Sequence, residues 1–375
     1  MNPSKILGNP EEKKRIEELL EKAGKDRVID SVVSGREDTS PRMLGLGGIV
    51  GLKEITKQDM QNSGDIYDVA FSPDNKWLAV GQWPAYLLKF DGKRLEDELA
   101  IKLLGKETYS VAFSKCGRYI ATGGKKDGSP PYEIKIYALE RMYIKGRSNS
   151  AIPVKKVRFS PDGKYVAAIR GGAGENIPRL TIYKFEKKNE KLQNIHTEYN
   201  ITDFEFYPDG KSIAAIWNQH GLFSLGVYRF SNKGILTPSS ETRISPVSKL
   251  LLSPNGKYFV LASEDKSTSK NELIVLNEPS LKYVFLSGEN YDSKIDDIAH
   301  DPGSECVVVA SGDNLGLFDY RIISLSGHDP KVDDINRSFQ NYQVKKLRFS
   351  PDGKYLAAAC SDKFVRIMEV VRKEK

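Results

Sequence analysis

One pattern of apolar and polar residues recurs along the chain and sets its expected architecture. Each copy has an apolar run that ends, in most copies, in Phe, then a short polar turn and a second apolar run. The copies read VAFSPDNKWLAV from Val69, VAFSKCGRYIAT from Val111, VRFSPDGKYVAA from Val157, FEFYPDGKSIAA from Phe204, LLLSPNGKYFVL from Leu250, IAHDPGSECVVV from Ile298 and LRFSPDGKYLAA from Leu347. Pro, Asp and Gly favour a tight turn, and the flanking runs are rich in β-branched and aromatic residues, so each copy predicts a β-hairpin.

The spacing of the copies predicts the fold. The third residue of each copy is taken as its anchor, which gives positions 71, 113, 159, 206, 252, 300 and 349, between 42 and 49 residues apart. Most hairpins are followed by a third apolar segment, such as EIKIYAL from Glu133 or RLTIYKF from Arg179, and by a weaker, more polar fourth. Seven four-stranded antiparallel units at this period predict an all-β, seven-bladed β-propeller over residues 46–372.

The ends of the chain are expected to play different parts. The last copy has room for only three strands, and GIVGLKEIT (Gly48–Thr56) alternates apolar and polar residues. We therefore expect residues 48–56 to pair beside Phe364–Val370 and close the ring. Residues 1–45 are expected to form an extension with a short amphipathic helix at about 10–23 and a linker. That helix would dock either on the propeller's own side or on a partner.

The last copy resembles the repeats of the WD-repeat (WD40-type) propeller family over KKLRFSPDGKYLAAACSDKFVRIMEV (345–370), and the resemblance extends over roughly residues 48–370. It is a divergent one. No third strand ends in Trp-Asp, and Gly327–His328 is the one Gly-His that precedes a copy, so the family's buried His–Ser/Thr–Asp–Trp hydrogen-bond network is incomplete in every repeat. The resemblance implies a seven-bladed platform that binds protein partners.

Composition adds limits rather than a function. The formal net charge is +7, but the chain has no arginine-rich run, so the sequence gives no strong signal for nucleic-acid binding. The small positive excess could instead assist binding to an acidic partner. The three cysteines, Cys116, Cys306 and Cys360, are too few and too scattered for a disulfide framework or a metal knuckle. Without a signal peptide or a membrane span, we expect the cytoplasm as the compartment, with the nucleus as the alternative.

The search for catalytic motifs favours a protein that is not an enzyme. The chain has no P-loop, no HExxH and no Gly-x-Ser-x-Gly motif, and its four histidines fall in different repeats without ligand spacing. No cofactor or metal is therefore expected. One enzyme interpretation stays open, because residues 225–263 and 180–193 also resemble lactonase-type propellers that act on sugar lactones. It rests on fold analogy and on no identified catalytic residue.

The aligned copies predict a binding rim where the innermost strands begin. The residue five before each anchor is β-branched and is expected in the core; the residues four, three and one before it vary in charge. The predicted partner-binding residues are Tyr67, Tyr109, Lys155, Lys156, Arg158, Asp296, Lys345, Lys346 and Arg348. They would form a basic arc from the third and seventh copies, an acidic patch from the sixth, and tyrosine anchors from the first two.

Three functions remain open on the sequence alone. The first is a non-catalytic scaffold, part of a complex, whose rim binds a peptide or protein with acidic or aromatic side chains. The second is the lactonase-like enzyme, and the third is a basic-faced binder of nucleic acid or anionic lipid. The charged rim could also serve only to keep the channel solvated.

Overall fold

The computed structural model describes most of the chain from residue 49 onward. The described ranges are 49–60, 64–103, 107–125, 132–140, 143–171, 179–185, 190–195, 200–230, 236–265, 270–278, 280–286, 294–303, 306–312, 314–319, 332–336 and 342–372. The expected helix at 10–23, the rest of the N-terminal extension and Gly327–His328 lie outside these ranges. Among the described residues, no helix is long and apolar enough to cross a membrane.

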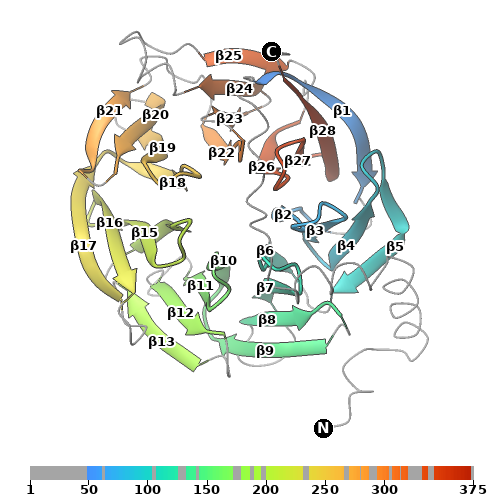
Figure 1. Ribbon diagram of the computed structural model, residues 1–375, viewed down its shortest axis with the longest axis horizontal. Coiled ribbons are helices and arrows are strands. Elements are labelled where there is room, and N and C mark those ends of the chain that lie inside the picture. Colours follow the sequence, from blue (N-terminus) through green and yellow to red (C-terminus); the bar gives the residue numbers. More distant parts are fainter. Residues whose placement is uncertain are drawn as a thin grey trace, which may run out of the picture.

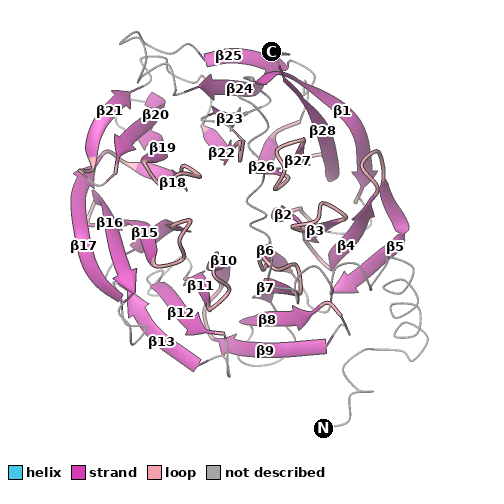
Figure 2. Ribbon diagram, viewed as in Figure 1, coloured by secondary structure: helices cyan, strands magenta, loops and turns pink. Residues whose placement is uncertain are grey.

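The described strands form seven four-stranded antiparallel sheets. The sheets stand in a ring around a common axis (Figures 1 and 2). The innermost strands are β2 (Asp68–Phe71), β6 (Thr108–Phe113), β10 (Val154–Phe159), β14 (Asn200–Phe206), β18 (Val247–Leu252), β22 (Ile295–His300) and β26 (Val344–Phe349). The second strands are β3 (Trp77–Gly81), β7 (Tyr119–Lys125), β11 (Tyr165–Arg170), β15 (Ser212–Gln219), β19 (Tyr258–Asp265), β23 (Cys306–Ser311) and β27 (Tyr355–Cys360).

The outer half of each sheet is built by two further strands. The third strands are β4 (Ala85–Phe90), β8 (Tyr132–Ala138), β12 (Arg179–Lys184), β16 (Leu222–Phe230), β20 (Lys270–Asn277), β24 (Asn314–Asp319) and β28 (Phe364–Arg372). The outermost strands are β5 (Leu95–Leu103), β9 (Tyr143–Ser150), β13 (Glu190–Ile195), β17 (Leu236–Ile244), β21 (Lys282–Leu286), β25 (Val332–Asn336) and β1 (Ile49–Asp59). The prediction of an all-β propeller with four-stranded antiparallel blades is confirmed. Blades are numbered below from blade 1 (β2–β5) to blade 7 (β26–β28 with β1).

The hairpin turns follow from the recurring Ser-Pro-Asp-Gly phrase. In blade 3 the Ser160 hydroxyl donates to Asp162 at 2.6 Å and accepts the backbone N–H of Tyr165 at 2.9 Å, which ties both ends of the turn together. Gly163 lies in the left-handed region at a φ of 71°, where a side chain would be strained. The copy in blade 1 has Asn75 at that position, with a φ of 59°, and Asn is a residue type that tolerates this conformation.

Each pair of neighbouring blades shares its own apolar cluster. Between blades 7 and 1, for example, Val69 and Leu78 pack with Ala357 and Ile367; six further clusters occupy the remaining interfaces around the ring. The residues five before the anchors are buried as expected, and all seven are at most 4% exposed: Ile66, Thr108, Val154, Ile201, Val247, Ile295 and Val344. The core is therefore a circle of interfaces between sheets.

The first strand of the described chain completes the last blade. β1 pairs antiparallel with β28, with Leu52 opposite Val370 and Asp59 opposite Phe364. Both Leu52 and Val370 are 7% exposed and lie in the apolar cluster between blades 6 and 7. Residues 48–56 were expected beside Phe364–Val370, and the pairing follows that expectation; the strand runs a few residues further, to Asp59. The boundary between extension and propeller stays a prediction.

Candidate functional site

The innermost strands all begin on one face of the ring, because every blade repeats the same strand order (Figure 1). We call this the entrance face and define it by the residue four before each anchor: Tyr67, Tyr109, Lys155, Thr202, Ser248, Asp296 and Lys345. Four of the predicted site residues lie just inside it, at three or one residues before the anchor: Lys156, Arg158, Lys346 and Arg348. The entrance face and the channel behind it form the candidate site.

A β-bulge near the start of most innermost strands determines which side chains face the channel. In six of the innermost strands the pairing with the second strand shifts register between the residues five and three before the anchor, as between Val154 and Lys156 in β10. Regular alternation would send those two residues to the same side of the sheet. The extra residue changes that, so Val154 enters the core while Lys156 lines the channel. The bulged residue itself, such as Lys155, lies at the channel mouth.

Blades 1 and 2 contribute an aromatic pair to the entrance face. The rings of Tyr67 and Tyr109 meet edge to face with centroids 5.0 Å apart. The Tyr109 hydroxyl donates to Glu107 at 2.5 Å, and Glu107 also pairs with Lys125 at 2.8 Å. Partial burial and the Glu107 carboxylate raise the pKa of Tyr109 above its ordinary value, so both phenols stay neutral. The two rings are half-buried, which leaves part of each available for contact.

The remaining rim residues differ in exposure. Lys155 is exposed at the mouth, whereas Lys345 and Asp296 are half-buried. Partial burial raises the pKa of Asp296 above its usual range, and the neighbouring Asp297 adds to that effect. The predicted basic arc and acidic patch thus reach the surface chiefly through Lys155 and through the two half-buried residues.

Inside the channel, the residues three before the anchors form a ring of alternating charge. In order they are Asp68, Ser110, Lys156, Asp203, Lys249, Asp297 and Lys346. Four of them accept a backbone N–H from the next blade: Val111 to Asp68 at 3.2 Å, Val157 to Ser110 at 3.1 Å, Leu250 to Asp203 at 3.0 Å and Leu347 to Asp297 at 3.0 Å. These bonds join neighbouring blades, and the three carboxylates are buried.

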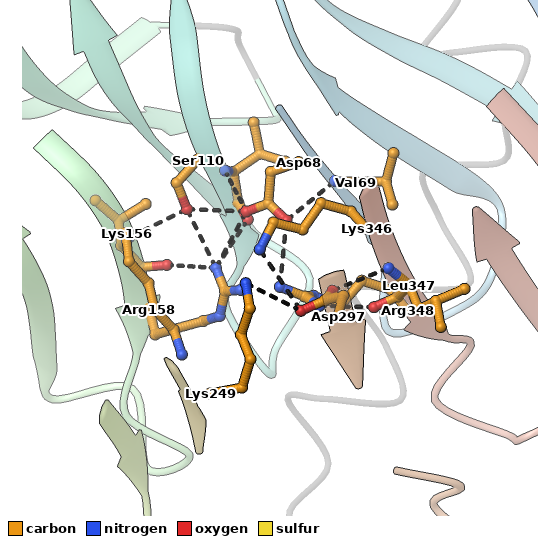
Figure 3. A network of polar contacts seen from close by, with 12 residues as sticks. Asp68, Val69, Ser110, Lys156, Arg158, Lys249, Asp297, Lys346, Leu347 and Arg348 are labelled. Carbon is orange, nitrogen blue, oxygen red and sulfur yellow. Dashed lines mark hydrogen bonds and ion pairs between the residues drawn. The ribbon is translucent and has the colours of Figure 1, made fainter. Parts of the chain in front are cut away.

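The two channel arginines come from the residues one before the anchors, and carboxylates hold both (Figure 3). Arg158 of blade 3 reaches Asp68 of blade 1 at 3.4 Å, and Arg348 of blade 7 reaches the same carboxylate at 3.3 Å. Arg348 also contacts Asp297 at 3.0 Å. The two arginines therefore converge on one aspartate from opposite sides of blade 1.

The predicted basic arc is thus mostly an internal ion-pair network. Lys156 is bound by Asp203 at 2.6 Å and Glu205 at 2.8 Å, and Lys346 lies 3.6 Å from Asp297. The cations were among the predicted site residues, but the groups that bind them were not: Asp68, Ser110, Asp203, Glu205 and Asp297. Lys249, a further cation beside Asp297, was also not among them. The signal was present in the same aligned columns, where Lys and Asp alternate from blade to blade.

The channel encloses a cavity of about 370 Å³. Six cations and four carboxylates line it: Lys155, Lys156, Arg158, Lys249, Lys346 and Arg348 with Asp68, Asp203, Glu205 and Asp297. Burial alone would raise the pKa of Asp297, but Lys346, Arg348 and Lys249 hold it far below its usual range. Nearby cations likewise lower the pKa values of Asp68 and Asp203 below their usual range, so these three aspartates are ionised at neutral pH. The cavity lining has more cationic side chains than carboxylates.

One histidine also lines the cavity. His300 stands where most copies have the anchor Phe, and its Nδ1 lies 2.8 Å from the carbonyl oxygen of Asp301. Burial lowers the pKa of His300 to about 4, so the ring is neutral near pH 7. Within the described ranges, no group of three or more His, Cys, Asp or Glu side chains is placed to hold a metal ion.

Comparison with known proteins gives matches in sequence. Residues 54–85 and 321–368 match the family model "WD domain, G-beta repeat". Eukaryotic translation initiation factor 3 subunit I of Candida glabrata is 24% identical over 269 residues, which cover 64% of this chain and 72% of that protein. Protein hir1 of Aspergillus fumigatus is 27% identical over 183 residues, or 45% of this chain and 16% of that protein.

A solved structure supports the fold. The β-propeller domain of Myceliophteria thermophila Cps50 (Swd1) superposes with a TM-score of 0.62 at 14% sequence identity, covering 84% of this chain and all of that one. At that identity the likeness concerns the fold alone. The matched repeats, the relatives in sequence and the circle of four-stranded blades together support a divergent WD-repeat β-propeller.

Proposed function

We propose that this protein is a non-catalytic interaction subunit that uses the entrance face to bind a protein or peptide partner within a larger complex. The observation that carries the proposal is the half-exposed Tyr67–Tyr109 pair at the mouth of a rigid channel. Tyrosines on a fixed scaffold offer large contact area at a low cost in conformational entropy, and aromatic residues are enriched at protein interfaces.

A third aromatic side chain, Trp83, extends this surface. The backbone N–H of Gly64 donates to the carbonyl of Trp83 at 3.2 Å, so the loop that carries Trp83 lies beside the segment leading into β2. Trp83 is 53% exposed, which is unusual for so large an apolar side chain. Trp83 was not among the site residues predicted from the sequence. Tyr67, Tyr109 and Trp83 give a partner three aromatic contacts on blades 1 and 2.

Charge supports a partner segment with an acidic side chain. Lys155 is exposed at the channel mouth, and the cavity behind it has more cations than carboxylates. An acidic side chain entering beside the aromatic surface would meet this positive field. Lys345 and Asp296 complete the proposed rim, and Lys156, Arg158, Lys346 and Arg348 would act from inside the channel.

The same arrangement argues against a nucleic-acid or lipid surface as the main function. Such surfaces expose lysines and arginines that are free to contact phosphates. Here Lys156, Arg158 and Arg348 are engaged with carboxylates inside the channel. Membership of a complex is supported by the relative whose name makes it a subunit of a translation initiation factor. For the same reason we propose the cytoplasm as the compartment, with the nucleus as the alternative.

The test is affinity purification from the source cell with variants of the entrance face. Lys155→Glu with Lys345→Glu reverses charge on the rim, and Tyr67→Ala with Trp83→Ala removes aromatic contact. We expect both pairs to lose the same specific partners, at least about tenfold, while Lys354→Glu on the far face keeps them. An unchanged partner set in both pairs would remove the entrance face as the binding site.

A further inference from the structure

Asp297 is surrounded by more positive charge than it neutralises. Arg348 contacts its Oδ2 at 3.0 Å, while the ammonium groups of Lys249 and Lys346 lie 3.7 and 3.6 Å from its Oδ1 (Figure 3). Three cations from blades 5 and 7 thus share one carboxylate of blade 6. All three side chains are at most 26% exposed, so water screens their mutual repulsion only in part.

The lysine across the channel shows what a satisfied ammonium group looks like here. Lys156 Nζ donates to Asp203 at 2.6 Å, to Glu205 at 2.8 Å and to the carbonyl of Phe204 at 2.8 Å. These three bonds use all three of its N–H groups. For Lys249 and Lys346, by contrast, no acceptor among the described residues comes within hydrogen-bond distance. The two half-buried ammonium groups therefore have donors to offer to a ligand.

The pKa of Lys346 also reflects the excess of positive charge around it. The pKa of Lys346 is lowered to about 8, chiefly by burial; Lys249 and Arg348 add to the lowering, and Asp297 opposes it. A lysine in this position gains from any additional negative charge nearby. The cavity it faces has a volume of about 370 Å³, whereas a water molecule takes about 30 Å³ of liquid volume, so a tetrahedral oxyanion fits with water to spare.

We propose that the channel is a binding site for a phosphate group, held between the ammonium groups of Lys249 and Lys346. Phosphate oxygens accept several hydrogen bonds at once, and charge-assisted bonds of this kind are the strong ones. The group would come from free orthophosphate or from a phosphorylated small molecule whose remainder projects through the entrance face. The site lies in the channel behind the proposed partner surface and shares Lys346 with it. Its test measures anion binding without any partner, so its failure can be told apart from failure of the proposed function.

The test measures anion binding to the full chain by isothermal titration calorimetry, with sodium chloride at matched ionic strength as the reference. The probes are inorganic phosphate, pyrophosphate and a nucleoside triphosphate. We expect phosphate or one of the phosphorylated probes to bind, and a saturating probe to raise Tm by about 2 °C over chloride. Binding of orthophosphate identifies the free anion as the ligand; binding of the larger probes alone identifies a phosphorylated compound.

Variants locate the site. Lys249→Met and Lys346→Met should each weaken binding at least about tenfold. Each leaves Asp297 with Arg348, the backbone N–H of Leu347 and one lysine, so the fold should persist, and circular dichroism checks this. Lys354→Met changes an exposed lysine on the opposite face and should bind as the unaltered protein does. The proposal is overturned if no probe binds better than chloride, or if Lys354→Met weakens binding as much as the two channel variants.

Discussion

Arg348 and Asp68 form an ion pair at 3.3 Å although 280 residues separate them in the chain. Because Arg348 also contacts Asp297, one side chain links blades 6, 7 and 1 on the channel side of the ring. The β1–β28 pairing links the same region on the outside. Ring closure therefore has an inner polar contact in addition to its outer strand pairing.

Removing the inner contact should weaken the fold measurably. We expect Arg348→Met to lower the free energy of unfolding by about 2 kcal/mol, because Asp68 and Asp297 are buried and each would lose a charged partner. Urea denaturation followed by circular dichroism measures this. Lys345→Met, three residues earlier on β26 and half-buried, should change the free energy of unfolding by less than about 0.5 kcal/mol. Equal effects of the two substitutions would contradict a special role for Arg348.

Asp297 should be the most costly channel carboxylate to neutralise. In Asp297→Asn, Lys249 and Lys346 would lose the carboxylate they share, and Arg348 would keep only Asp68, so we expect a loss of about 3 kcal/mol in the free energy of unfolding. Adding Lys346→Met should restore part of that loss, because one of the repelling charges is gone. A double-mutant cycle at low salt should give a coupling of at least about 1 kcal/mol. Strict additivity would show that the two residues do not interact.

Deletions separate the closing strand from the chain before it. A chain lacking residues 1–58 loses nearly all of β1 and leaves the edge of β28 unpaired, so we expect a large drop in Tm together with aggregation. A chain lacking residues 1–40 keeps β1 and should melt as the full chain does. Differential scanning calorimetry of both chains gives the comparison. A melt unchanged by the longer deletion would refute the role of β1 in closure.

His300 should make stability depend on pH in mildly acidic solution. Its folded pKa of about 4 lies below the ordinary value of 6.5, so between these values the unfolded chain binds a proton that the folded protein refuses. His300 therefore has no effect on the free energy of unfolding above about pH 6.5. As the pH falls from 6.5 toward 4, the free energy of unfolding should drop by on the order of 2–3 kcal/mol. His300→Phe should flatten this part of the curve and leave any loss below pH 4 unchanged. Urea midpoints measured from pH 4 to pH 8 test it.

The repeat was predictable because its causes are local. The hairpin turns depend on residues such as Ser160 and Gly163 that act within a few positions, and burial of Ile66 and its equivalents follows from β-branched residues at a fixed place in each copy. The closing strand followed from counting strands in the last copy. All of these features can be predicted from the sequence of one repeat and the number of repeats.

The ion pairs were not predictable in the same way. The alternating column placed Lys156 and Asp203 on successive blades, but no sequence pattern says that Arg158 reaches back two blades to Asp68. The β-bulge at Lys155 and at the equivalent residues was not predicted either, because it is visible only in the pairing of the innermost strand with the second strand. Both depend on the width of the channel and the twist of the sheets, which are set by the whole ring.

The pairing of β1 with β28 has a consequence for synthesis. Among the described strands, β1 is the first to leave the ribosome and β28 the last. While the blades between them are being made, the nascent chain carries an unpaired first strand whose edge could join another chain. The ring can be completed only once translation has passed Arg372, so its closure joins the first and the last of the described strands to be synthesised.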